Sequence, residues 1–375
     1  MIQKVISKCK LLVYFLFQSF PINKTTVFFF SYYGEQYSGS PKYLSEYLYE
    51  KNAFHVIWAF VDKKKHLCAK YNRSVKYGGI KYYYYLATAK YLVTNYRMTT
   101  DFHKRKNQVY IQTWHSSLRL KMIESDAADT LPRSYIDMAK NDSQQIDYLL
   151  AGSRKSKEIF ENAFWYNGPI LKTGTPQCDI LIEKPKTIVT KVKKHFALPD
   201  NSRIMLYAPT FRKDHKTDIY SIDTDRLIKT CENKFGGSWY LLIRLHPHLI
   251  NQCNFIDYSS KVLQATDYDD VQELLCAADL LISDYSAIIF DYAITKKPCF
   301  LYTPDIDEYT KNDRKLYFDI NTLPFPCCMS YDSLIEHIFS FTDSIYESKV
   351  NQFLESVGSY DDGNARKRVY ELFRK

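Results

Sequence analysis

The segment from Ala278 to Tyr302 constrains the fold more than any other part of the chain. Its apolar run at residues 280–282 predicts a buried strand, and a helical pattern of apolar residues follows a short polar turn. A Lys-Lys-Pro sequence ends that helix, and the next apolar run predicts a second strand. Such a unit is typical of an open α/β sheet, where ligands bind at the carboxyl ends of the strands. A helix that begins there suits a phosphate, because its first N–H groups and its dipole are positive.

The same alternation of strand-like and helix-like segments extends over most of the 375 residues and predicts parallel sheets. The expected strands lie at residues 26–30, 56–60, 92–94, 109–113, 148–151 and 170–173, and in a second series at 204–208, 240–244, 262–263, 280–282 and 299–302. A polar segment separates the two series, so we expect one domain at 21–183 and another at 186–375, with helices at its C-terminal end. Two such domains that meet at a cleft suit an enzyme that brings a donor to an acceptor away from water.

Residues 1–20 are basic and then apolar. The apolar run is far shorter than the roughly 20 residues of a membrane span, and no small-residue cleavage site follows it. Apolar residues between Ile2 and Leu16 share one helical face, with Lys4 and Lys8 opposite. Two interpretations fit this pattern equally well, an interfacial membrane helix and a helix that packs on its own domain.

The overall composition narrows the function classes. A formal net charge of +9 favours an anionic partner, such as nucleic acid, anionic lipid or a nucleotide diphosphate. No arginine-rich run or zinc-finger spacing favours nucleic acid. Nine scattered cysteines without a Cys-x-x-Cys pair indicate reduced thiols. Dinucleotide, Walker and nucleophile-elbow motifs are absent from the sequence. No Asp-x-Asp pair ends a strand, and we interpret Asp305-Ile306-Asp307 as a solvated loop, so no metal is expected.

Two histidines follow predicted strands. His115 comes after the strand at 109–113, where an imidazole can take a proton from a hydroxyl nucleophile. A structural histidine held by backbone hydrogen bonds is the alternative. His246 follows the strand at 240–244, and Arg244 points to the same side of that strand. Together they would neutralise a diphosphate, or else form a surface ion pair.

Two further strand ends carry groups that suit a phosphate. Thr210 can donate to a phosphate oxygen, and Arg212 can bind one through two nitrogens unless Asp214 occupies it. Ser286 can cap the helix after residue 285, or meet a phosphate together with the Ala287 N–H. Asp284 would repel a phosphate, so we expect it to orient a histidine or arginine, or to face a sugar hydroxyl.

Several motifs together resemble one family. They are Gln112-Thr113-Trp114-His115, Tyr207-Ala208-Pro209-Thr210-Phe211-Arg212, Arg244-Leu245-His246-Pro247 and Ser283-Asp284-Tyr285-Ser286, joined by Tyr148 to Ser153, Gly174-Thr175-Pro176 and Asp361 to Ala365. In this order they are similar to motifs of the CDP-glycerol glycerophosphotransferases, the polymerases and primases of teichoic-acid-like polymers. The resemblance extends from about Phe28 to the C-terminus.

The resemblance implies a GT-B fold, with two Rossmann-like domains and a central cleft, and a metal-independent reaction without a cofactor. An acceptor hydroxyl would attack the β-phosphate of a CDP-alditol, and CMP would leave. By motif position, His115 would be the general base, and His246 would stabilise the departing CMP. The donor-binding set would be Thr210, Arg212, Arg244, His246, Ser283, Asp284, Ser286 and Ala287, and the acceptor-side set Trp114, Ser116 and Ser117. The family usually has Gly-Thr-Pro where this chain has Ser116-Ser117-Leu118, so the departure from the family pattern falls on the acceptor side, while the donor side matches it better.

We therefore predict a CDP-alditol phosphotransferase, with CDP-glycerol or CDP-ribitol as the type of donor. Its acceptor would be a hydroxyl of a cell-surface glycan or a lipid-linked polymer, and it would work peripherally at the anionic cytoplasmic face of the cell membrane. Nucleic acid is not an expected partner, and the sequence leaves the oligomeric state open. A GT-B glycosyltransferase that uses a nucleotide sugar is the first alternative, and a catalytically silent binding protein of the same fold is the second.

Overall fold

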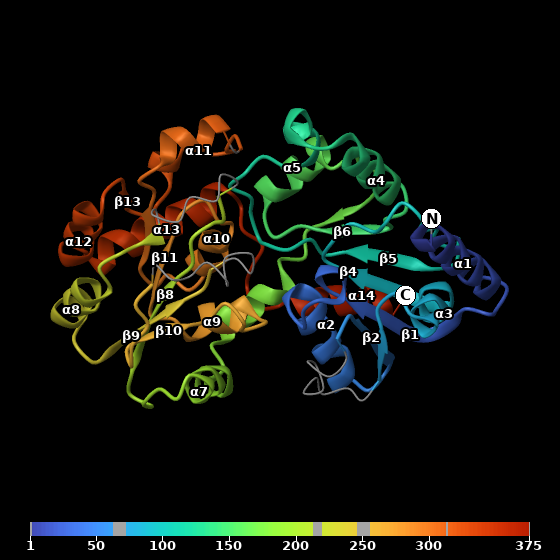
Figure 1. Cartoon of the computed structure of the whole chain (residues 1–375), viewed down its shortest axis with the longest axis horizontal. Helices are drawn as coiled ribbons and strands as arrows, with labels where there is room; N and C mark the ends of the chain where they lie inside the picture. Colours follow the sequence, from blue (N-terminus) through green and yellow to red (C-terminus); the bar gives the residue numbers. More distant parts are fainter. Residues whose placement is uncertain (1, 63–72, 213–219, 246–255, 313, 375) are drawn as a thin grey trace. The chain divides into compact units, whose positions relative to one another are not determined.

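The computed structural model describes residues 2–62, 73–212, 220–245, 256–312 and 314–374. The chain forms two compact units (Figure 1). Unit 1 contains residues 1–115, 123–179 and 360–375, and unit 2 contains residues 116–122 and 180–359. Within the described ranges, no helix has the length and apolar character needed to cross a membrane.

Unit 1 is built on a parallel seven-stranded sheet in the order β3-β2-β1-β4-β5-β6-β7. The strands are β1 (Asn23–Phe30), β2 (His55–Phe60), β3 (Ser74–Lys76), β4 (Ala89–Thr94), β5 (Val109–Gln112), β6 (Tyr148–Leu150) and β7 (Ile170–Leu171). The α-helices are α1 (Ile2–Phe17), α2 (Gly39–Glu50), α3 (Ile80–Thr88), α4 (Arg133–Ser143), α5 (Arg154–Ala163) and α14 (Ala365–Phe373). Short 3-10 helices are η1 (Tyr32–Gly34), η2 (Glu124–Thr130) and η3 (Pro176–Cys178). The sequence pattern predicted these strands except β3, a three-residue strand at the sheet edge.

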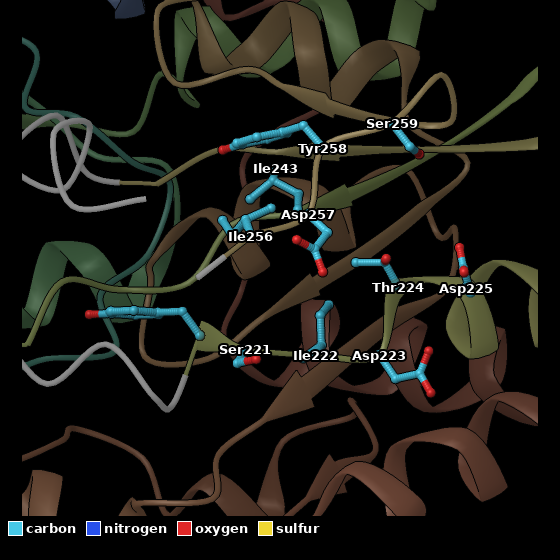
Figure 2. Close-up of a pocket in the computed structure, with 11 residues that line it drawn as sticks. Ser221, Ile222, Asp223, Thr224, Asp225, Ile243, Ile256, Asp257, Tyr258 and Ser259 are labelled. Carbon is cyan, nitrogen blue, oxygen red and sulfur yellow. The ribbon is translucent and has the colours of Figure 1, made fainter. Parts of the chain in front are cut away.

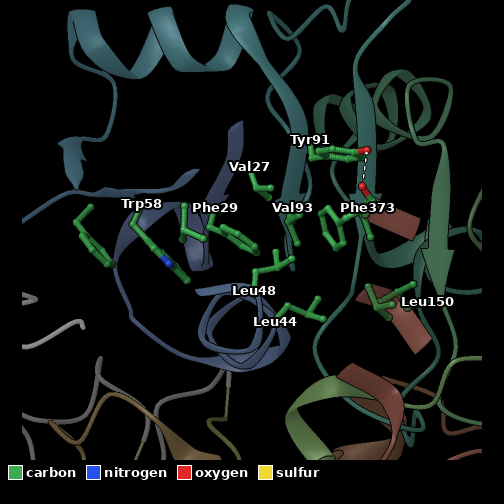
Figure 3. Packing of buried hydrophobic residues seen from close by; sticks show 13 residues of the cluster. Val27, Phe29, Leu44, Leu48, Trp58, Tyr91, Val93, Leu150 and Phe373 are labelled. Atoms are coloured by element: carbon green, nitrogen blue, oxygen red, sulfur yellow. Dashed lines mark hydrogen bonds between the residues drawn. The ribbon is translucent and has the colours of Figure 1, made fainter. Parts of the chain in front are cut away.

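The core of unit 1 lies between the sheet and its helices (Figure 3). Phe29 of β1 stacks on Trp58 of β2 with ring centroids 5.6 Å apart, and apolar side chains of α2 cover them. The C-terminal helix α14 completes this core with Val369 and Phe373. The Tyr91 hydroxyl donates a 3.1 Å hydrogen bond to the Phe373 carbonyl, which attaches the end of the chain to β4.

Two carboxylates hold α14 in unit 1. The Asp179 carboxylate accepts the backbone N–H groups of Ala365 and Arg366, at 3.0 and 2.9 Å, and so caps the helix from a distant part of the chain. The Asp361 carboxylate, which lies shortly before α14, accepts the Thr175 N–H and so attaches the start of the helix to the segment before η3. The predicted boundary near residue 183 is close to the observed change of unit at residues 179–180, but assigning the C-terminal helix to the second domain was wrong.

Unit 2 is built on a parallel six-stranded sheet in the order β10-β9-β8-β11-β12-β13. The strands are β8 (Arg203–Tyr207), β9 (Trp239–Ile243), β10 (Val262–Gln264), β11 (Leu280–Ser283), β12 (Cys299–Tyr302) and β13 (Cys327–Cys328). The helices are α6 (Asp179–Glu183), which begins at the boundary, α7 (Lys186–His195), α8 (Thr224–Phe235), α9 (Val271–Ala277), α10 (Ile288–Ala293), α11 (Ile306–Asn312), α12 (Tyr331–Phe339) and α13 (Asp343–Ser356), with the short 3-10 helix η6 (Ile320–Thr322). The strand–turn–helix–strand unit predicted at residues 278–302 is present as β11, α10 and β12.

Residues 116–122 also belong to unit 2, which the sequence did not predict. Backbone hydrogen bonds connect this segment to residues 315–317: the Met122 N–H donates to the Lys315 carbonyl and the Tyr317 N–H donates to the Leu120 carbonyl. The change of unit therefore falls at the peptide bond that follows His115.

Candidate active site

His115 lies three residues past the end of β5, as the sequence predicted for a strand-end histidine. Its ring is partly buried, and Nδ1 lies 3.3 Å from the backbone carbonyl oxygen of Asn95. A carbonyl oxygen only accepts hydrogen bonds, so in the neutral imidazole this contact places the proton on Nδ1. The lone pair is then on Nε2, which is the nitrogen that can take a proton from a hydroxyl.

Aromatic rings surround the His115 imidazole. The Trp114 ring stacks on it at 4.4 Å, and the rings of Tyr96 and Tyr32 lie 6.2 and 6.4 Å away. Three neighbouring backbones have positive φ values that side-chain-bearing residues rarely adopt: Trp114 (52°), Tyr32 (45°) and Tyr33 (56°). Strained backbones of this kind persist only where the surrounding structure fixes them, and they are most frequent at functional sites.

The other predicted acceptor-side residues are internal. Trp114 is buried, and the Ser116 hydroxyl donates to the Leu118 carbonyl. In unit 2, the N–H and the hydroxyl of Ser117 both donate to one carboxylate oxygen of Asp291, at 2.9 and 2.7 Å. The two serine hydroxyls therefore hold the segment 116–122 in shape, and the structure does not support a direct role for them in acceptor binding.

In unit 2, Arg212 forms a buried ion cluster with two carboxylates. Its Nε donates to Asp305 at 2.6 Å, and Nη2 contacts Asp284 at 2.9 Å and Asp305 at 3.1 Å. The guanidinium also lies over the rings of Tyr285 and Tyr309, at 4.8 and 5.0 Å from their centroids. Arg212 is only 4% exposed. Its prediction as a diphosphate ligand is therefore corrected: its donors are directed at protein groups, and the cluster supports the fold.

The contacts of this ion cluster test what the sequence predicted for Asp284 and Asp305. Asp284 orients an arginine, as one of its two predicted roles required, and its carboxylate also accepts the Thr210 N–H. Asp305 was expected in a solvated loop, but its side chain is mostly buried against Arg212. Burial acts to raise the pKa of Asp305, but the hydrogen bonds and charge of Arg212 outweigh it and lower that pKa. The sequence could have predicted that Asp305 and Asp284 lie close together. They follow β12 and β11, which are parallel neighbours, so both residues come after the carboxyl ends of adjacent strands.

The remaining donor-side predictions have mixed outcomes. The Ser283 hydroxyl donates to the Ala208 carbonyl and is fully buried. Ala287, not Ser286, is the N-cap of α10, and it makes no side-chain cap. With six residues, α10 is also too short for a strong dipole. Both residues are partly exposed, so they stay candidate ligands without the predicted cap.

Thr210 and Arg244 keep features of ligand-binding residues. The Thr210 hydroxyl oxygen is buried and has no hydrogen-bond partner within the part of the chain that the structure describes. Arg244 is partly exposed, and its Nη1 donates to the carbonyls of Ala265, at 3.1 Å, and of Tyr268. These bonds hold the guanidinium just after β9. His246, the second predicted catalytic histidine, lies outside the described residues.

A hollow of about 370 Å³ begins at Ile243, the last residue of β9 (Figure 2). The other lining residues are Tyr220, Ser221, Ile222, Asp223, Thr224, Asp225, Ile256, Asp257, Tyr258 and Ser259. Among the described residues, hydroxyls and three carboxylates dominate this lining, which suits a neutral, hydroxyl-rich group better than a pyrophosphate. Among the described residues, no cluster of three or more His, Cys, Asp or Glu side chains is placed to hold a metal ion. Metal independence stays a prediction.

Comparison with solved structures identifies the fold. A structure of the wall teichoic acid polymerase TagF superimposes with a TM-score of 0.85 and 27% sequence identity, and covers 100% of this chain and 95% of that one. A UDP-GlcNAc 2-epimerase from Neisseria meningitidis shares the fold alone, with a TM-score of 0.53 and 13% identity. The prediction of a GT-B fold with two parallel-sheet units and a terminal helix is confirmed.

The family is shown by sequence. The family described as CDP-Glycerol:Poly(glycerophosphate) glycerophosphotransferase matches residues 12–375, and the chain belongs to it. The teichoic acid poly(glycerol phosphate) polymerase of Staphylococcus epidermidis is 31% identical over 94% of this chain, which spans 51% of that protein. The polymerase of the same name from Bacillus spizizenii is 30% identical, with 94% of this chain and 92% of that protein covered. The family predicted from the motifs is confirmed.

Proposed function

We propose that this chain transfers an alditol phosphate from a CDP-alditol, of the CDP-glycerol or CDP-ribitol type, to a hydroxyl of a growing teichoic-acid-like polymer and releases CMP. Relatives named as glycerol-phosphate and ribitol-phosphate polymerases support both donor types. The observation that carries the proposal is the family match over residues 12–375, together with a strand-end histidine whose Nδ1 faces the Asn95 carbonyl at 3.3 Å.

The proposed reaction has one chemical step. The acceptor hydroxyl loses its proton to Nε2 of His115 while its oxygen forms a bond to the β-phosphorus of the donor. The bond between that phosphorus and the oxygen that bridges it to the α-phosphate breaks. CMP leaves with the electron pair, so charge develops on its phosphate and cationic or hydroxyl donors stabilise it. No metal enters this scheme.

Unit 2 would hold the donor. Thr210 can donate its buried hydroxyl to a phosphate oxygen, and the guanidinium of Arg244 is held in place by two carbonyls. His246 has the corresponding role by its place in the family motif. The hydroxyl-rich hollow after β9 would take a neutral part of the donor, because its carboxylates disfavour the pyrophosphate.

A donor screen tests this function. Purified protein would be incubated with a lipid-linked glycerol phosphate acceptor and, in parallel, with CDP-glycerol, CDP-ribitol, UDP sugars or GDP sugars. We expect CMP release with one or both CDP-alditols and no nucleotide release from the sugars. Turnover of a nucleotide sugar instead would identify a glycosyltransferase, and CDP binding without product from any acceptor would favour a silent binding protein.

We also propose that unit 1 binds peripherally to the cytoplasmic face of an anionic membrane through an apolar surface on α1 and α3. This surface consists of the exposed side chains Leu12, Phe15, Leu16, Ile80 and Tyr84 of these helices, together with Phe20, which follows α1. The exposed Lys10 and Lys81 belong to the same helices. The opposite side of α1 packs on the unit, since Tyr14 is buried and its hydroxyl donates to the His103 carbonyl at 2.6 Å. Both interpretations of the N-terminal helix therefore have support, one on each face.

A single charge should weaken this membrane contact. Leu16 is 60% exposed, and Leu16→Glu would place a carboxylate between the apolar surface and anionic lipid. We expect the partition coefficient on phosphatidylglycerol vesicles, measured by co-sedimentation, to fall by roughly tenfold or more. Ile345→Glu in unit 2 is the matched control, because Ile345 is equally exposed, at 58%. Equal vesicle binding by both variants would rule out this surface.

A further inference from the structure

Two buried carboxamides hold the strained backbones that flank His115. The Gln112 side-chain oxygen accepts the N–H of Trp114 at 3.0 Å, and the Asn95 side-chain oxygen accepts the N–H of Tyr32 at 3.1 Å. Trp114 and Tyr32 both have left-handed backbones, and their rings lie 4.4 and 6.4 Å from the His115 imidazole. Both Asn95 and Gln112 have 0% exposure, so their amides act inside the unit and not at its surface.

Gln112 is itself held from the other end. Its Nε2 donates to the Tyr96 carbonyl at 2.8 Å and to the Tyr110 hydroxyl at 3.0 Å. Because a carbonyl only accepts, this contact fixes which end of the amide is nitrogen and leaves the oxygen toward Trp114. The Tyr110 hydroxyl then donates to Asp142 at 3.0 Å. A directed chain of hydrogen bonds thus connects a carboxylate to the Trp114 N–H, and each bond polarises the next.

The far end of this chain of hydrogen bonds is a buried ion cluster. Asp142 pairs with Arg97 at 3.1 Å, and Arg97 also pairs with Glu124 at 3.1 Å. Arg97 donates to the Ser143 hydroxyl at 2.8 Å, and all of these side chains are buried. Removing any one partner from a buried ion cluster leaves an unpaired charge, which strongly lowers the free energy of unfolding. The cluster therefore fixes Asp142, and through Tyr110 it fixes Gln112.

We propose that Gln112 and Asn95 are positioning residues for the general base. Gln112 holds the Trp114 backbone and so sets the direction in which the next residue, His115, leaves the strand. The side-chain oxygen of Asn95 accepts the Tyr32 N–H, and the backbone carbonyl oxygen of Asn95 accepts a hydrogen bond from Nδ1 of His115. Together they keep the imidazole in one orientation and one tautomer, with Nε2 as the base. This inference rests on the proposed function of His115.

The first test compares two buried glutamines. Gln112→Met removes three hydrogen bonds next to His115. Gln108→Met removes three elsewhere in unit 1, those to the Leu86 and Ala89 carbonyls and from the Arg105 N–H. Both side chains are almost fully buried, so both variants should lose thermal stability to a similar degree. We expect kcat for CMP release to fall about 100-fold for Gln112→Met and to stay at the wild-type value for Gln108→Met, at a temperature where both are folded.

A second measurement does not depend on turnover. Nitrogen NMR of histidine-labelled protein distinguishes the two imidazole tautomers, and loss of the signal in His115→Ala identifies the His115 resonances. Wild type and Gln108→Met should show a single Nδ1-protonated form. Gln112→Met should show a mixture of tautomers. Tyr110→Phe, which keeps the Gln112–Trp114 bond and breaks the connection to Asp142, should lie between them in both kcat and tautomer ratio.

The outcomes separate this inference from the proposed function. Equal kcat and unchanged His115 resonances in Gln112→Met and Gln108→Met would overturn the inference and reduce the network to support of the fold. If even the wild type releases no CMP, the proposed function fails, but the NMR comparison still decides whether Gln112 holds the imidazole.

Discussion

His115→Ala is expected to lower kcat for CMP release by about 10²–10⁴-fold, the usual contribution of general base catalysis. The acceptor hydroxyl must lose its proton as it attacks, and alanine offers no group to take it. Binding of CDP should be unchanged, because the proposed donor ligands belong to unit 2 and His115 to unit 1. CMP release would be followed with CDP-glycerol and a lipid-linked acceptor, and CDP affinity by isothermal titration calorimetry.

His55→Ala is the matched control for this experiment. His55 is an exposed histidine of the same unit, at the first residue of β2. Its replacement should change neither kcat nor CDP affinity. If His115→Ala turned over at the wild-type rate, the contact of Nδ1 with the Asn95 carbonyl would have only a structural purpose, and the general base would have to be sought elsewhere.

The parts of the fold that the sequence predicted are those with local signals. The apolar run 280–282 is entirely buried in β11, and the strand after the Lys-Lys-Pro sequence is β12. In both cases the residues that pack together are close in the chain, or they follow the period of a strand or helix. Two of the four edge strands, β3 and β13, were not predicted. They have three and two residues, and such short elements carry little periodic signal, although the equally short β7 and β10 were predicted.

Contacts between residues that are far apart in the chain could not be predicted from the sequence pattern. The bonds of Asp179 to the start of α14 join positions 186 and 187 residues apart, and those of Arg212 to Asp305 join positions 93 apart. Nothing local predicts such partners, so the C-terminal helix was assigned to the wrong unit and Arg212 was taken for a ligand. The left-handed turn at Trp114 was equally hidden, because such turns are usually marked by glycine or asparagine.

The candidate site shows the same division. The strand-end position of His115 was predictable from the apolar run before it, and the ion pair of Asp284 with Arg212 is one of the roles that the sequence left open for that aspartate. The residues that hold His115 were not predictable, since Asn95 comes from a different strand end and Gln112 was noted only as part of a motif. Buried carboxamides have no period and no charge, and their value depends on which N–H groups the tertiary fold brings to them.

Arg212→Met is expected to lower the free energy of unfolding of unit 2 by about 3–5 kcal/mol, the usual effect of removing one partner from a buried ion cluster. Methionine keeps much of the side-chain length but leaves Asp284 and Asp305 as unpaired carboxylates. The loss would be measured by urea denaturation, and Arg226→Met serves as the control. Arg226 pairs with Asp332 at 2.7 Å on the surface, where water screens the pair, so no change in the urea midpoint is expected.

The pH dependence gives this prediction a second readout. Since the pKa of Asp305 is lowered in the folded protein, its ion pair contributes stability above the ordinary carboxyl pKa of about 3.9. That contribution is lost as the pH falls through the lowered folded value. Arg212→Met should therefore lose this part of the acid sensitivity of wild type. A variant that kept wild-type stability at every pH but no longer bound CDP would instead restore Arg212 as a ligand of the diphosphate, because only a group that contacts the nucleotide changes affinity without changing the fold.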